Sequence, residues 1–183
     1  MFSVKSYVIC VFSALLMLGQ MAHAEARSVD MLLGDLASSD AQTAIDIDRE
    51  LQAIWRKSGS ASMDLMLRRG VDALERGDAA LAHEHLSALV DHAPDFAAGW
   101  FKRAEALFRL DQIGPAIADL ERALALNPND YNALFALGTV FEHLQSPKRA
   151  FDAYTRAKAI HPHHEEVISA LERLTPQVQG QEL

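Results

Sequence analysis

The sequence predicts an all-α solenoid, that is, a stack of helix pairs, and three observations support this prediction. Alanine and leucine are abundant, whereas the chain of 183 residues contains only 9 Gly and 6 Pro, which favours helix over strand. Three prolines, Pro94, Pro128 and Pro162, follow one another at intervals of 34 residues. Apolar residues recur between them at the spacing of a helix face, and a period of this length is typical of stacked helical repeats.

Composition limits the class of protein before any motif is considered. With 50% hydrophobic and 23% charged residues, the chain is neither a disordered nor a collagen-like sequence, and its single Cys excludes a disulfide scaffold. The 25 Asp and Glu exceed the 17 Lys and Arg, which gives a net charge of −8. Because nucleic-acid binding depends on cations placed against phosphates, we do not expect nucleic acid as a partner.

Residues 1–24 have the features of a secretory signal peptide. Lys5 precedes an uncharged apolar run over residues 7–18, and Ala22-His23-Ala24 places small residues three and one positions before a cleavage site. We expect cleavage after Ala24 and an exported, periplasmic protein. The apolar run has roughly a dozen residues, whereas a membrane-spanning helix needs about 20, so we expect no membrane span in the mature chain.

The interval between the prolines divides the chain into three aligned blocks, 63–96, 97–130 and 131–164. At about 100° per residue, places 4, 7, 8 and 11 of each block share one face of a first helix, and places 20, 24 and 27 share one face of a second. The proline at place 32 ends the second helix, because the residue before a proline is pushed out of the helical region. Small residues recur at places 8 and 20, where we expect the paired helices to cross: Gly70, Ala104 and Gly138 opposite Ala82, Ala116 and Ala150.

This pattern resembles the tetratricopeptide repeat (W-x2-L-G-x2-Y, A-x3-F, then P), and the middle block, with Trp100, Ala104, Ala116 and Pro128, matches it best. The other blocks depart from it at Met66 and Leu134, where Trp is usual, and at Ala73, where Tyr is usual. The resemblance implies a right-handed superhelix of three helix pairs whose first helices line a concave groove. With its signal peptide, the chain also resembles small exported proteobacterial members of this family, which implies no defined biochemical role.

Helical segments flank the repeats on both sides. Residues 25–62 contain two amphipathic stretches, 29–37 and 41–57, which we interpret as an N-terminal helical cap or a degenerate fourth repeat. Residues 165–183 are expected to form a C-terminal capping helix that covers the last apolar face of the stack, followed by a frayed tail. We expect Pro176 to end that helix.

The sequence contains little that suggests catalysis or metal binding. His161, His163 and His164 cluster around Pro162, where we expect them to be polar loop residues rather than metal ligands. We find no G-x-S-x-G, H-E-x-x-H, Gly-rich phosphate loop or C-x-x-C motif. We therefore expect a protein that is not an enzyme and holds neither a cofactor nor a metal ion.

The face of each first helix opposite the core stripe carries the candidate site. The resemblance implies that the residues at places 2, 5, 6, 9, 12 and 13 of each block lie in the concave groove. Apolar groups and cations there suit a peptide with apolar anchors and a carboxylate. Two alternatives remain: these residues pack between repeats, or the N-terminal helices fill the groove. The candidate partner-binding residues are Leu67, Arg68, Phe101, Lys102, Phe108, Arg109 and Phe135.

The sequence therefore predicts a non-catalytic interaction module of the bacterial periplasm that binds a protein segment in its groove. The alternative is a structural or self-associating subunit of an envelope complex, with the groove filled by the chain itself. The chaperone-binding members of the family use a Lys/Asn carboxylate clamp, but Leu67 and Val71 stand at the positions that this clamp requires.

Overall fold

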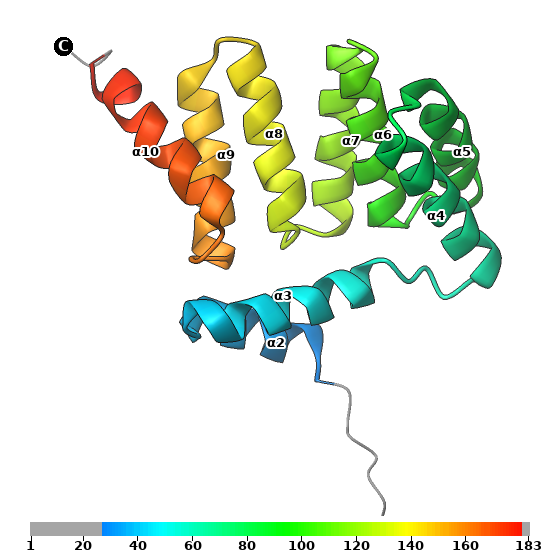
Figure 1. Ribbon diagram of the computed structural model, residues 1–183, viewed down its shortest axis with the longest axis horizontal. Coiled ribbons are helices and arrows are strands. Elements are labelled where there is room, and N and C mark those ends of the chain that lie inside the picture. The colour runs from blue at the N-terminus through cyan, green and yellow to red at the C-terminus, as the bar shows by residue number, and fades with distance from the viewer. Residues whose placement is uncertain (1–26, 181–183) are drawn as a thin grey trace, which may run out of the picture.

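The computed structural model describes residues 27–180, and all regular secondary structure in that range is helical, which confirms the predicted all-α class (Figure 1). The expected signal peptide, 1–24, lies outside the described residues. None of the helices within 27–180 combines the length and the apolar character needed to cross a membrane. The helices are α2 Val29–Ser38, α3 Ala41–Trp55, α4 Ala61–Glu75, α5 Ala79–His92, α6 Ala97–Arg109, α7 Ile113–Leu126, α8 Tyr131–His143, α9 Pro147–Ile160 and α10 Glu165–Gln179.

The repeats form the helix pairs α4/α5, α6/α7 and α8/α9, which stand side by side (Figure 1). The turn inside each pair has a left-handed residue at the same place of the repeat: Gly77 with φ 79°, Asp111 with φ 59° and Gln145 with φ 53°. Only glycine adopts this conformation without a steric cost. The second and third repeats keep the turn with other residues, so the shared turn geometry follows from the packing of the helix pair rather than from a glycine motif.

The small residues at place 8 lie where the two helices of a pair cross, as predicted, but their neighbours differ from the expectation. A Cβ added to Gly70 would lie 2.5 Å from Leu86 Cγ, and one added to Gly138 would overlap the ring of Tyr154. Both neighbours stand at place 24, so the small residue of the first helix accommodates a large side chain of the second. Ala82 and Ala150, which the sequence places opposite the glycines, are nevertheless fully buried.

The described residues have two apolar cores. The smaller core belongs to α4 and α5, with Leu67, Leu74, Leu86 and Leu89 at its centre and Ala106 from α6. The larger core joins the second and third repeats to α10 and also contains apolar residues of α2 and α3. The pair α2–α3, which we call the N-terminal hairpin, thus shares its core with the repeats most distant from it in sequence. Its buried apolar residues are Leu32, Leu36, Ala44, Ile47 and Leu51.

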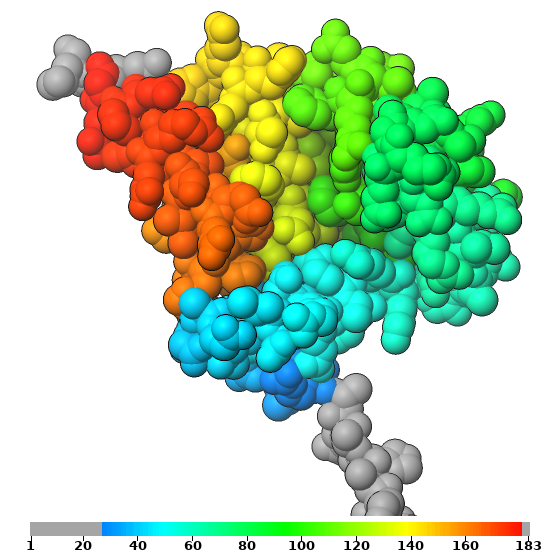
Figure 2. Space-filling view, viewed as in Figure 1, coloured from blue at the N-terminus to red at the C-terminus, as the bar shows by residue number. Residues whose placement is uncertain are grey.

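The N-terminal hairpin lies across the stack, with α3 beneath the ends of the repeat helices (Figure 1), and Figure 2 shows it closing that edge. Its polar contacts with the third repeat centre on Tyr131, whose hydroxyl donates to Asp48 and accepts from Gln52 Nε2 at 3.3 Å. The ring of Trp55 packs on Tyr131 with centroids 5.5 Å apart. Because Tyr131 begins α8, these contacts attach α3 directly to the edge of the third repeat.

The histidines around Pro162 lie in the turn between α9 and α10, as expected, but they belong to the same attachment and are not solvated loop residues. His161 is buried, with 8% of its surface exposed, and its ring packs edge-on against Tyr131 at 5.0 Å. A ring nitrogen of His163 lies 2.9 Å from the carbonyl oxygen of Ser39, between α2 and α3. Burial lowers the pKa of His161, because its charged form would lose hydration there.

Helix α10 packs against α9 and buries Val167, Leu171 and Leu174. It continues through Pro176 to Gln179, so the expectation that Pro176 ends the helix was wrong. A proline inside a helix removes one backbone hydrogen bond. That loss falls in the last turn, after the packed apolar stripe has already fixed the helix axis. The hydroxyl of Thr175 also donates to the Leu171 carbonyl at 2.7 Å.

Candidate partner-binding groove

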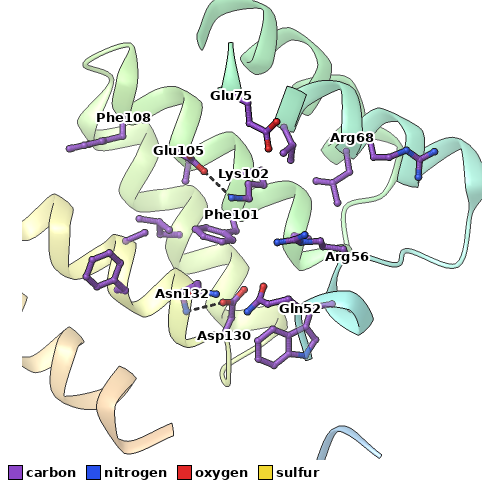
Figure 3. Close-up of a pocket in the computed structure, with 18 of the residues that line it drawn as sticks. Gln52, Arg56, Arg68, Glu75, Phe101, Lys102, Glu105, Phe108, Asp130 and Asn132 are labelled. Atoms are coloured by element: carbon purple, nitrogen blue, oxygen red, sulfur yellow. Dashed lines mark hydrogen bonds and ion pairs between the residues drawn. The ribbon is translucent and has the colours of Figure 1, made fainter. Parts of the chain in front are cut away.

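A groove with a cavity of about 860 Å³ runs along the first helices of the three repeats, α4, α6 and α8 (Figure 3). These helices contribute residues from the places that the sequence pattern predicted, and the last turn of α3 contributes a side wall. The N-terminal hairpin therefore borders the groove and leaves this cavity open. Of the seven candidate residues, the cavity is lined by six: Leu67, Arg68, Phe101, Lys102, Phe108 and Phe135.

Three phenylalanines line the groove in a half-buried state. Lys102 Nζ lies 4.7 Å from the centroid of the Phe101 ring. Phe108 packs against His143, and Phe135 packs against Tyr154 at 5.5 Å. Each of the three phenylalanine rings thus contacts a neighbouring side chain and also lines the cavity. By contrast, Leu67 is 4% exposed and belongs to the core of α4 and α5, so it offers little surface to a ligand.

The cations at places 6 and 13 of the second repeat have partners within the protein. Lys102 Nζ is 2.9 Å from Glu105 Oε2, and Arg109 Nη2 is 2.6 Å from Glu105 Oε1. The Nη1 of Arg109 donates to the Leu74 carbonyl at 2.6 Å, which ties α6 to α4, and Arg109 does not line the cavity. Glu105 therefore offsets much of the positive charge that the sequence pattern placed here.

Sequence reasoning missed Arg56, which follows the last residue of α3 and lines the cavity. Figure 3 shows its side chain reaching toward the ring of Phe101. Neither Arg56 nor Arg68 forms an ion pair with another residue in the described range 27–180. Arg56 lies outside the repeats, so the repeat pattern could not assign it to the groove.

Two carboxylates near this side of the groove have structural roles. Asp64 accepts hydrogen bonds from the Ser58 hydroxyl at 2.6 Å and the Ser58 backbone N–H at 2.8 Å, and these bonds lower its pKa. Asp130 caps α8 by accepting from two backbone N–H groups. Burial raises the pKa of Asp130, and the two bonds oppose that effect only in part. Other carboxylates of the lining, Asp72 and Glu75, stand at the far end of α4.

The histidine, cysteine and acidic residues of the described range include no group of three that could hold a metal ion. The groove combines aromatic surface, three cations that form no ion pair within residues 27–180 (Arg56, Lys57 and Arg68) and a carboxylate end. These are means of holding a ligand by apolar contact and by charge.

Stacked helix pairs with a groove along their first helices define an α-solenoid of the repeat type. The family model of the tetratricopeptide repeat matches residues 67–113 and 111–165, which together cover more than half of the chain. The protein therefore belongs to the tetratricopeptide repeat family, as its sequence pattern predicted.

Known proteins with similar sequences or structures include members of the same family. A TPR repeat-containing protein of Rhizobium etli is 25% identical over 137 residues, which are 74% of this chain and 67% of the relative. The first TPR domain of Spaghetti (RPAP3), solved with an HSP90 peptide, superposes with a TM-score of 0.61 at 23% identity, over 64% of this chain and 93% of that one. The Yersinia enterocolitica type III secretion chaperone SycD, solved with a YopD peptide, gives a TM-score of 0.60 at 14% identity, over 64% of this chain and 95% of that one.

Proposed function

We propose that the protein is a non-catalytic interaction module that binds a segment of another protein in the groove along α4, α6 and α8. The observation that carries this proposal is the open cavity of about 860 Å³, with Phe101, Phe108 and Phe135 in its lining. Aromatic side chains are over-represented among the residues that dominate binding energy. A groove that residues 27–180 leave open favours an external ligand over a purely structural role.

Relatives of the same fold support the proposal. Two of the similar structures, the Spaghetti (RPAP3) TPR domain and SycD, were solved with peptides of their partner proteins. Their low identity with this chain does not transfer those partners. What supports the proposal is that the same arrangement of helix pairs holds peptides in other proteins.

The test uses peptides selected by the purified protein from a displayed library of random twelve-residue sequences. We expect Phe101→Ala to weaken binding of a selected peptide at least about tenfold, because a desolvated aromatic anchor carries roughly 2 kcal/mol or more. Phe151→Ala is the matched control, since Phe151 is a partly buried phenylalanine of α9 that does not line the cavity. The melting temperature of each variant is measured first, and peptide binding is then measured by fluorescence anisotropy.

A folded Phe101→Ala variant that binds with wild-type affinity would remove the groove from the mechanism. A loss of affinity accompanied by a fall of several degrees in melting temperature would show that Phe101 acts mainly in packing. In that case Phe108→Ala, which alters the same cavity from about two turns further along α6, becomes the deciding variant.

A second candidate function is self-association through the exposed side of the first repeat. Leu65 of α4 is 41% exposed beside the partly buried Met63 and Met66. Sedimentation equilibrium tests this candidate. A concentration-dependent dimer that Leu65→Glu abolishes would support it, whereas a monomer throughout the micromolar range would exclude it.

We further propose that the protein is exported to the bacterial periplasm after cleavage behind Ala24. Lys5, the short apolar run and the Ala22-His23-Ala24 site support this proposal. N-terminal sequencing of the protein from the periplasmic fraction is expected to begin at Glu25. Recovery of a chain that begins at residue 1 in the membrane fraction would indicate an anchor instead.

A further inference from the structure

This inference rests on the proposed function and concerns the chemistry of the bound segment. We propose that Arg56, supplied by α3 from outside the repeats, selects segments that carry an Asp or Glu side chain within their length, and that Tyr131 positions it. The ligand is thus a protein segment with apolar residues next to an internal carboxylate.

The direction of α3 decides which part of a ligand meets Arg56. The helix runs beneath the ends of successive repeat helices (Figure 1), and its last turn lines the side of the cavity. A segment that contacts Phe101 and Phe135 in turn must pass alongside α3. It therefore presents its side chains, and not its chain terminus, to the side wall that carries Arg56.

The charges around the wall favour an acidic side chain. Arg56, Lys57 and Arg68 line this cavity, and the described residues give none of them an ion-pair partner. Asp64 bonds to Ser58, and the charges of Arg68 and Lys57 further lower its pKa. Asp130 caps α8, and Asp72 and Glu75 stand at the far end of α4. Lys102, by contrast, already has Glu105. A ligand carboxylate would find an uncompensated cation at Arg56, and a bidentate contact with a guanidinium is geometrically favoured.

Tyr131 determines where the last turn of α3 lies. Asp48, Gln52 and Trp55 stand at helical spacing on one face of α3, and all three contact Tyr131. Arg56 follows Trp55 directly, so the same contacts orient its backbone. Beyond it, residues 57–60 lead to α4, and Gly59 has φ 84° with open space around it. The contacts with Tyr131 therefore hold Arg56 against the groove from the hairpin side.

The experiment compares peptide selections by the purified wild-type protein and by Arg56→Glu. The probe is the random twelve-residue library, displayed with its C-termini fused so that no terminal carboxylate is free. We expect wild-type selections to be enriched in Asp or Glu near apolar residues, and Arg56→Glu selections to lose that enrichment. Arg49→Glu is the matched control, because Arg49 is an exposed α3 residue that pairs with Asp46 and does not line the cavity.

A thermodynamic cycle then tests direct contact. A selected peptide is synthesised with an amidated C-terminus and with its acidic residue as Glu or Gln. We expect Arg56→Gln to weaken binding of the Glu peptide about threefold to tenfold, and to leave the Gln peptide unchanged. We expect Tyr131→Phe, like Arg56→Gln, to reduce the preference for the Glu peptide over the Gln peptide. If Tyr131 only stabilised the fold, Tyr131→Phe would weaken the binding of both peptides equally.

The outcomes separate this inference from the proposed function. If wild-type protein selects no peptides, the proposed function fails and the inference falls with it. If peptides bind but acidic enrichment is absent, or is unchanged in Arg56→Glu, the inference is overturned and the groove function stands. If the selected peptide binds more tightly with a free C-terminus than with an amidated one and shows no preference for Glu over Gln, the contact is with a chain end and the proposal of an internal side chain is wrong.

Discussion

The two ends of the described chain both cover apolar surface of the repeats, but they do so in different ways. Helix α10 packs against α9 as the next helix in the stack, with Val167, Leu171 and Leu174 buried. The N-terminal hairpin does not stack on the first repeat, which follows it in the chain. It buries Leu32, Leu36 and Leu51 in the core of the second and third repeats. The sequence predicts helices at both ends, which we interpret as caps, with a degenerate fourth repeat as the alternative at the N-terminal end.

The difference shows that amphipathic spacing predicts that a helix face is buried, but not the surface that covers it. The stripe of α10 and the stripe of α3 have similar residues and similar spacing. The two helices differ in how they are connected to the stack. Helix α10 follows α9 through a short turn, whereas residues 56–60 connect α3 to α4 and allow α3 to cross the edge of the stack. The hairpin thereby becomes part of the groove wall, and α10 does not contribute to that cavity.

The largest expected effect comes from removing a buried leucine at each end. Leu51 in α3 is 0% exposed and Leu174 in α10 is 2% exposed, so each change to Ala is expected to cost about 2–5 kcal/mol of unfolding free energy. In hydrogen exchange, Leu51→Ala should loosen α8 and α9 more than α4 and α5, because their cores are separate. Greater loosening of α4 and α5 would contradict the position of the hairpin. Leu65→Ala is the exposed control.

A smaller effect is expected from Tyr131→Phe, which removes the hydroxyl that joins Asp48 and Gln52 to the third repeat. The loss of a hydrogen bond to a charged group is expected to cost about 1.5–3 kcal/mol. Amides of α2 and α3 should lose protection by hydrogen exchange while those of α10 keep it. Tyr154→Phe serves as the control, since the Tyr154 hydroxyl contacts Thr139 within the third repeat. Equal loss of protection at both ends would show that Tyr131 acts on the whole stack.

The hairpin attachment should also be sensitive to pH. The folded state lowers the pKa of His161 by burial, so the unfolded chain binds a proton more readily. This contribution to stability is present above the ordinary histidine pKa of about 6.5 and is lost as the pH falls below it. Denaturation midpoints between pH 7.5 and 5 should therefore fall less steeply for His161→Phe than for wild type. His92→Gln, at an exposed histidine, should keep the wild-type slope.

The smallest effect is expected on the outer face of α10. Glu172 is exposed and forms no ion pair within the described residues, so Glu172→Gln should change the unfolding free energy by less than about 0.5 kcal/mol. Chemical denaturation checks this value. A larger change would mean that the outer face of α10 is not a solvated end and that another surface covers it.

The sequence by itself determined the period, the helix pairs and the places of close helix crossing. These features follow from local spacing, because a repeated pattern on each helix states which side is apolar and where the helix must break. Spacing put Phe101, Phe108 and Phe135 on the face opposite the core stripe, and the resemblance to the tetratricopeptide repeat implied that this face lines the groove. The family assignment follows from the same period.

Only the tertiary structure decided which groups meet. Asp119 is buried and bonded by Arg103 at 2.7 and 2.8 Å, yet neither residue is distinguished by the repeat pattern. The pairing of Glu105 with Lys102 and Arg109 depends on side-chain positions that spacing alone does not specify. The hairpin brings Arg56 to a groove formed by later residues, because apolar burial is not directional and any complementary surface can satisfy it.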